Sequence, residues 1–128
     1  MALAVLMTTL VVAASAPAHK RLYNASNTIS LNKLPGGDSI SGQLTSKGLC
    51  LKGRTVVVYE DVDTSVSGDI IEIGRTRTSS TGAWSLAVPG SIKKGRTYFA
   101  QVTKRKVADN RKHKHTCKGA TSPTAVGA

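Results

Sequence analysis

The chain has 128 residues, with 18 Lys and Arg against seven Asp and Glu and a formal net charge of +11. This length has room for one domain, with enough apolar sequence for a core of modest size. The excess of positive charge favours anionic partners or surfaces, and it carries no information about the fold.

The first 18 residues carry no charged side chain and contain two apolar runs. They end in Ala16-Pro17-Ala18, a small-x-small sequence typical of signal peptidase cleavage. A membrane anchor is the alternative, but this segment is short for a span and is interrupted by hydroxyl side chains. We therefore expect a signal peptide over 1–18 with cleavage after Ala18, and a secreted or cell-surface protein with no membrane span in its mature part.

Residues 19–37 are expected to form a polar lead-in segment, followed by the main domain over 38–128. Within the lead-in, Thr28, Ile29 and Leu31 predict a short strand that ends before the turn former Pro35. Asn24 begins a formal N-glycosylation sequon, although such triplets are frequent by chance.

The main domain has the alternating pattern of half-buried β-strands. Ile40, Gly42 and Leu44 share one face of a strand predicted over 39–45, and residues 54–60 are the most β-prone run of the chain. A further strand is predicted over 96–103, with Tyr98, Ala100 and Val102 on one face.

Residues 70–88 predict a β-hairpin around which the domain is organised. Ile71 and Ile73 alternate with polar neighbours before the turn formers of 78–82, and Trp84 and Leu86 alternate after them. Gly82 can adopt the positive φ that a hairpin loop of three to five residues requires. The only Trp of the chain is therefore expected to point into the core.

Two charged segments lie outside these predicted strands, an acidic one and a basic one. The acidic segment has Asp61, Asp63 and Asp69, but it lacks the spacing of a calcium-binding EF-hand loop, so a solvated acidic edge is the preferred interpretation. The basic segment, residues 104–118, has no apolar period and is expected to be a long basic loop or extended hairpin tip that leads into a strand around Cys117.

Turn formers recur about every ten residues and no segment has helical periodicity, so we expect an all-β fold. The predicted architecture is a single antiparallel β-sandwich of about seven strands, with a barrel as the alternative. Cys50 and Cys117 are the only cysteines. Because exported proteins enter an oxidising environment, these two cysteines are expected to form a disulfide.

Several short stretches resemble the transthyretin-like sandwich domains, which are also called prealbumin-like or carboxypeptidase-regulatory-like and share an Ig-like architecture. These stretches are residues 41–44, 52–59, 74–78 with 82–86, and 95–100. The chain is most similar to the small secreted actinobacterial type, in which one Cys precedes the Lys-Gly-Arg turn and another lies in a late strand. The matching positions are turn glycines and core residues, so the resemblance implies a fold and is nearly silent on activity.

The chain also departs from functional members of that family. The enzymes that hydrolyse hydroxyisourate end in Tyr-Arg-Gly-Ser, whereas this chain ends in Thr124-Ala-Val-Gly-Ala128. No Asn follows Asn110, so the Lys–Asn isopeptide of pilin-type relatives is not expected. No Gly-x-Ser-x-Gly motif occurs, and we expect no catalytic residues and no enzymatic activity.

Anion binding is the first functional hypothesis. Ten of the cationic side chains, but only one acid, lie between Lys93 and Lys118. Such a patch binds polyanions by releasing counterions, and the aromatic residues of single-strand nucleic-acid binders are absent after Thr103. The expected partner is an anionic cell-surface glycopolymer or another polyanion, and a solubilising segment without a dedicated ligand is the alternative. The candidate residues are Lys104, Arg105, Lys106, Arg111, Lys112 and Lys114.

Copper binding is the competing hypothesis. Signal cleavage would leave His19 at the N-terminus, where its amine and ring can bind copper, and His113 or His115 could complete the site. Two histidines in a Lys-rich segment are more often part of a solvated run of charge, and a disulfide removes Cys117 as a ligand. The preferred expectation is therefore a module with no metal and no cofactor.

Overall fold

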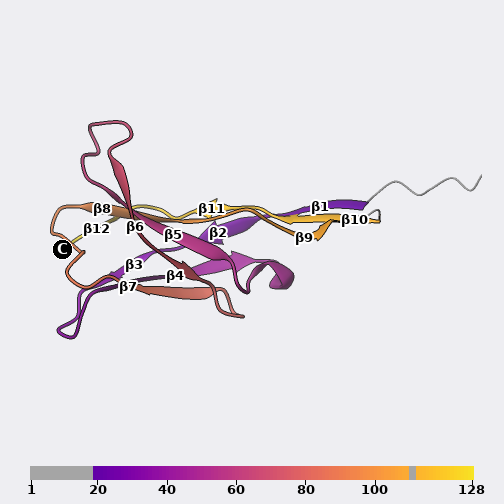
Figure 1. Ribbon diagram of the computed structural model, residues 1–128, viewed down its shortest axis with the longest axis horizontal. Coiled ribbons are helices and arrows are strands. Elements are labelled where there is room, and N and C mark those ends of the chain that lie inside the picture. Colours follow the sequence, from indigo (N-terminus) through magenta and orange to yellow (C-terminus); the bar gives the residue numbers. More distant parts are fainter. Residues whose placement is uncertain (1–18, 110–111) are drawn as a thin grey trace, which may run out of the picture.

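The computed structural model describes residues 19–109 and 112–128, which form strands joined by turns and one short 3₁₀ helix (Figure 1). The expected signal peptide over 1–18 and the candidate Arg111 lie outside the described residues. The strands are β1 (His19–Tyr23), β2 (Ala25–Asn27), β3 (Ser30–Asn32), β4 (Ser39–Ser46), β5 (Thr55–Asp61), β6 (Ile70–Arg77), β7 (Ala83–Ala87), β8 (Thr97–Val102), β9 (Arg105–Asp109), β10 (His113–Cys117), β11 (Ala120–Thr121) and β12 (Ala125–Val126), and the 3₁₀ helix is η1 (Gly48–Cys50).

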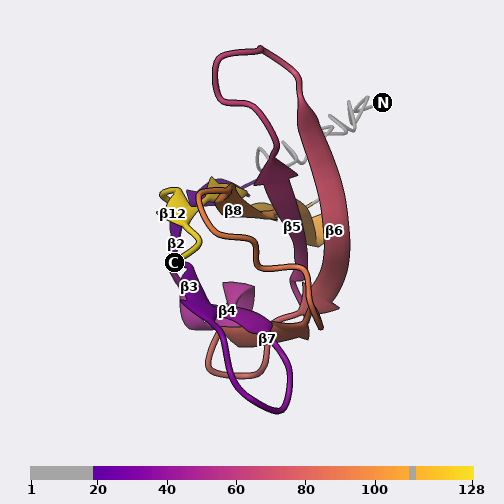
Figure 2. The same ribbon diagram turned by 90° about the vertical axis from the view of Figure 1, so that its left-hand side faces the viewer.

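Two antiparallel layers make up most of the molecule. One layer has the order β11-β8-β5-β6, with β12 also paired to β8. The other is built on β4, which pairs with β2, β3 and β7. Figure 2 shows β4 and β7 across from β5 and β8. The expected all-β sandwich fold is thereby confirmed.

The core lies between these layers and is built by alternation along the strands. Tyr98, Ala100 and Val102 are fully buried, as predicted for one face of β8. The Tyr98 hydroxyl donates a hydrogen bond to the carbonyl oxygen of Ser91 at 2.8 Å, so the polar end of this aromatic side chain is satisfied. The buried core cluster consists of Ile40, Leu44, Val56, Val58, Trp84, Val88, Ile92, Tyr98, Ala100 and Val102.

Trp84 is buried as expected and lies against Gly42, its partner on the neighbouring strand β4. Its Nε1–H donates a hydrogen bond of 2.9 Å to Oδ1 of the buried Asn27. A Cβ atom at position 42 would lie 2.4 Å from the Trp84 ring and 2.1 Å from the carbonyl oxygen of Thr28. Glycine is therefore required here because the indole and the backbone occupy the space of any side chain.

The predicted hairpin across residues 70–88 is wrong, although its turn is present. Gly82 has φ of 86°, but β6 pairs with β5 and β7 pairs with β4. Thr78 N–H bonds to Arg54 O in one layer, whereas Gly82 O accepts from Leu44 N–H in the other. The turn therefore connects a strand of one layer to a strand of the other. The prediction failed because apolar alternation does not distinguish two strands paired in one sheet from two strands packed across two sheets.

A third sheet of three strands extends beyond the two layers (Figure 1). β9 and β10 form an antiparallel hairpin, which agrees with the predicted hairpin tip, and β1 adds to β10 in parallel, which the sequence did not indicate. β8 leads into β9 and β10 leads into β11, so this sheet continues a hairpin that begins in the sandwich. We call β1, β9 and β10 the arm, and the two layers the sandwich.

Candidate functional site on the arm

The arm is joined covalently to the sandwich at its base. Cys117, the last residue of β10, forms a disulfide with Cys50 in η1, with their Cα atoms 5.6 Å apart. Both cysteines are fully buried, and the predicted pairing is confirmed. Next to the bridge, Lys118 N–H donates a 2.9 Å hydrogen bond to Tyr23 O, which ties β1 to the same point.

A buried arginine strengthens this junction. Arg54 is only 1% exposed, and its guanidinium donates three hydrogen bonds of 2.8 Å to backbone carbonyl oxygens. The acceptors belong to Cys50, Thr103 and Lys118, so one side chain joins η1, the end of β8 and the end of β10. Burial, and then the charge of Arg105, lower the pKa of Arg54. Carbonyl oxygens partly replace the water that this cation loses on burial.

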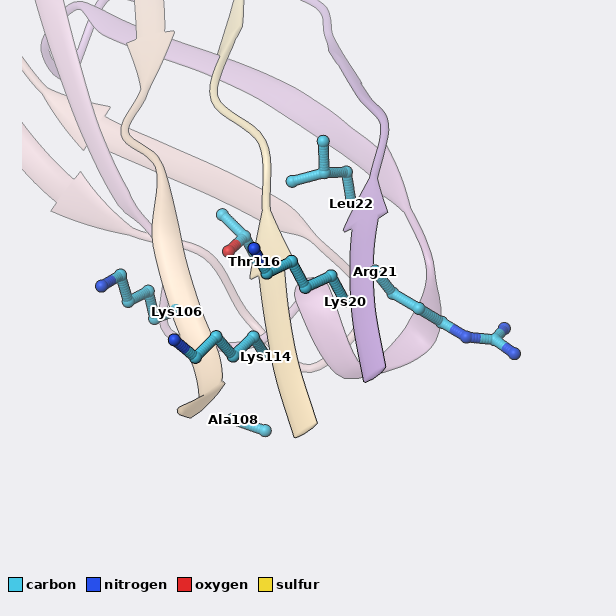
Figure 3. A pocket seen from close by; sticks show the side chains of 7 residues that line it. All are labelled: Lys20, Arg21, Leu22, Lys106, Ala108, Lys114 and Thr116. Atoms are coloured by element: carbon cyan, nitrogen blue, oxygen red, sulfur yellow. The ribbon is translucent and has the colours of Figure 1, made fainter. Parts of the chain in front are cut away.

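One surface of the arm gathers lysines from all three strands, and we call it the lysine face. In the parallel register Lys20 lies opposite Lys114 and Leu22 opposite Thr116, and Thr116 lies opposite Lys106 of β9. Lys20, Lys106 and Lys114 extend to the same side, whereas Arg21 extends away (Figure 3). The three lysines line a pocket of about 340 Å³, together with Arg21, Leu22, Ala108 and Thr116.

The lysine face contains only part of the predicted anion-binding set. Lys106 and Lys114 line the pocket, whereas Lys104, Arg105 and Lys112 are not among its lining residues. Sequence reasoning missed Lys20, Leu22 and Thr116, because nothing in the lead-in segment indicated that it would pair with residues 113–117. Residues 19–23 have no apolar alternation that would have marked them as a strand.

The opposite surface of β1 and β10, which we call the histidine face, brings all three histidines of the chain together. The ring centres of His19 and His113 are 5.9 Å apart, those of His19 and His115 are 5.5 Å apart, and those of His113 and His115 are 5.3 Å apart. The period of two along a strand explains this, since His19 lies opposite His113 and His115 follows two residues later.

His115 is the least exposed ring of the three, and its two nitrogens differ. Nδ1 lies 3.5 Å from the hydroxyl oxygen of Tyr23, whereas Nε2 is buried with no hydrogen-bond partner. Burial, and then the charges of His113, His19 and Arg21, lower the pKa of this imidazole. The neutral form, which has a free lone pair on one nitrogen, is thereby favoured.

Within residues 19–109 and 112–128, no three His, Cys, Asp or Glu side chains are arranged to hold a metal ion as they stand. This statement covers the histidine face and also the acidic segment with Asp61, Asp63 and Asp69. In that segment Asp63 Oδ1 instead accepts hydrogen bonds from the backbone N–H and hydroxyl of Ser65. The same residues include no helix of the length and apolar character needed to cross a membrane.

Comparison of the chain with family profiles, curated proteins and solved structures gives no significant match. Functional assignment therefore depends on the chemistry of the arm itself.

Proposed function

We propose that the protein is a secreted, non-enzymatic binding module of the transthyretin-like type that holds an anionic polymer on the lysine face of its arm. The observation that carries this proposal is the convergence of Lys20, Lys106 and Lys114, from three adjacent strands, on one pocket. Lys20 and Lys114 lie opposite each other on strands about 4.8 Å apart and form a short row, and Lys106 lies further along the sheet, opposite Thr116.

The chemistry of this pocket fits phosphate or sulfate groups on a chain. None of the described residues that line it is acidic. Lysine ammonium groups bind such anions as flexible point charges, and the bound chain releases its counterions. Leu22, which is 66% exposed, adds an apolar wall beside the row and can cover the carbon backbone of a polymer.

Secretion is supported by the disulfide, because buried Cys–Cys bridges persist in oxidising compartments and are rare in the cytosol. The transthyretin-like assignment is supported by the sandwich fold and by the position of Cys50 just before the turn that ends at Arg54. An extracellular module of this kind meets anionic glycopolymers and other polyanions at the cell surface.

The test measures binding of inorganic polyphosphate of defined length by the mature protein at several salt concentrations. A variant with Lys20→Gln, Lys106→Gln and Lys114→Gln is compared with the unchanged protein. Each phosphate contact contributes roughly 0.7 to the slope of log affinity against log salt, so losing three contacts should make this slope less steep by about 2. This change corresponds to about 100-fold weaker binding at 0.1 M salt.

The matched control replaces three exposed lysines of the sandwich, Lys33, Lys93 and Lys94, by Gln. These lysines lie in the β3–β4 and β7–β8 connections, at the end of the molecule away from the arm (Figure 1). Both variants lose the same charge, so only a local site separates them. Equal affinities and equal salt slopes for the two variants would show that net charge alone attracts the polymer, and the proposal would be wrong.

A further inference from the structure

The histidine face has the dimensions of a three-imidazole metal site. Zinc binds imidazole nitrogen at roughly 2.0–2.1 Å, which places each ring centre about 3 Å from the metal and ring centres about 5 Å from one another in tetrahedral geometry. The three ring-centre distances on the arm are 5.3, 5.5 and 5.9 Å. The rings do not form a metal site as they stand, so metal binding requires their side chains to rotate.

His115 has a polar neighbour at one ring nitrogen, as metal-binding histidines do. Metal-binding histidines usually interact through their second ring nitrogen with a neighbouring polar group, which fixes the tautomer and leaves the other nitrogen for the metal. Tyr23 is that neighbour for Nδ1, at 3.5 Å, and its ring also meets the imidazole edge on with centres 5.8 Å apart. Nε2 is buried and unpartnered, which is unusual for a polar atom in a folded protein.

Arg21 competes with a metal ion for a ring nitrogen of His19. It lies between His19 and Tyr23 on β1, and its Nε–H donates a 2.5 Å hydrogen bond to His19 Nε2. The lone pair of that nitrogen is therefore occupied by the guanidinium. His19, His113 and Arg21 are all exposed, so Arg21 can swing into solvent and release the His19 nitrogen.

We propose that His19, His113 and His115 bind one divalent transition-metal ion through their side chains, and that Arg21 must leave His19 for this to happen. Imidazole ligands suit Zn²⁺, Ni²⁺ and Cu²⁺, and Cu²⁺ is expected to bind most tightly of the three. The metal site lies on the face opposite the lysines, although Arg21 borders both sites, since it lines the lysine pocket and hydrogen-bonds His19. The metal site needs no N-terminal amine and no cysteine.

The experiment titrates the protein with Zn²⁺ while the imidazole signals are followed by NMR and the heat of binding by calorimetry. Because the chain has three histidines, every imidazole signal belongs to the proposed site. We expect one ion per chain, with all three rings shifting together. His113→Asn and His115→Asn should each weaken binding at least 10- to 100-fold, the loss typical even for residues that only support a ligand.

Two further variants test the roles of the neighbours. Arg21→Met should strengthen Zn²⁺ binding because the competing donor and its charge are removed, and Tyr23→Phe should weaken binding roughly 10-fold through His115. Lys20→Gln and Lys114→Gln, on the same strands but the opposite face, serve as controls and should alter the affinity far less. Disulfide content and circular dichroism show whether each variant is folded.

Three results would overturn the proposal. One is a shift confined to His19, with His113→Asn and His115→Asn binding as well as the unchanged protein, which would place the metal at the chain end alone. Another is binding of less than one ion per chain at saturating Zn²⁺. A third is unaltered affinity in Arg21→Met, which would remove the assigned role of the guanidinium.

Discussion

The sandwich and the arm are both built of β-strands, but each is stabilised in a different way. The ten buried core residues come from the sandwich and its connections, and β1, β9 and β10 contribute none of them among the described residues. The arm instead relies on backbone pairing, the Cys50–Cys117 bridge and the carbonyl contacts of Arg54. A region freed from supplying the core can place polar side chains on both of its faces, and the arm does so with lysines on one and histidines on the other.

This contrast predicts that the largest change in stability follows loss of the bridge between the two regions. The bridge closes a loop with a sequence separation of 67, which corresponds to about 4 kcal/mol in the chain-entropy model. The double variant Cys50→Ser, Cys117→Ser should lose about that much unfolding free energy in urea titrations. Hydrogen exchange should show the greater loss of protection in β10 than in β5. Equal loss in both strands would contradict a junction that holds mainly the arm.

The next largest effect is expected at Arg54. Replacing it by Met removes three charge-assisted hydrogen bonds and leaves three carbonyl groups without their donor, so we expect a loss of about 3 kcal/mol. The control is Arg77→Met, because Arg77 is exposed and makes one 3.3 Å contact with Gly53 O. Urea denaturation of both variants measures the difference. Similar stabilities for the two would mean that the buried guanidinium does not hold the junction.

A smaller effect, within the sandwich alone, is expected at Gly42. Gly42→Ala places a methyl group against the Trp84 ring and Thr28 O, and relieving this overlap should cost about 2 kcal/mol. Gly48→Ala is the matched control, since a Cβ atom there meets nothing within 4 Å. Thermal unfolding compares the two substitutions. Polyanion binding by folded Gly42→Ala should be unchanged, because its strand lies outside the arm.

The smallest effect on stability is expected from the lysine face. The triple variant Lys20→Gln, Lys106→Gln, Lys114→Gln alters side chains that are all exposed, so its unfolding free energy should change by less than about 0.5 kcal/mol per position. The same variant should lose most of its polyphosphate affinity. A large loss of stability would show that these lysines support the fold, and the separation between scaffold and binding region would not hold.

The difference between the two regions also explains what the sequence could predict. Buried strands show their inner face as apolar alternation, so the core positions of β4 and β8 and the turn at Gly82 were correctly predicted. The pairing of β6 was not, because Ile71, one of the two alternating residues, is 48% exposed, and alternation alone does not indicate which strand is the partner. The arm has no apolar period, and its parallel pair joins His19 to His113, a contact that no local pattern encodes. The disulfide was predictable because two cysteines allow only one pairing.

Chemical-shift mapping by NMR tests the central claim, that the arm binds while the sandwich supports it, most directly. The folded protein is titrated with polyphosphate, and backbone and lysine side-chain signals are followed in the same sample. The account predicts the largest shifts at Lys20, Lys106 and Lys114 and in the amides around them, with small shifts in β4 and β5. Largest shifts around Lys33, Lys93 and Lys94 instead would contradict it, because the polymer would then be held by the sandwich.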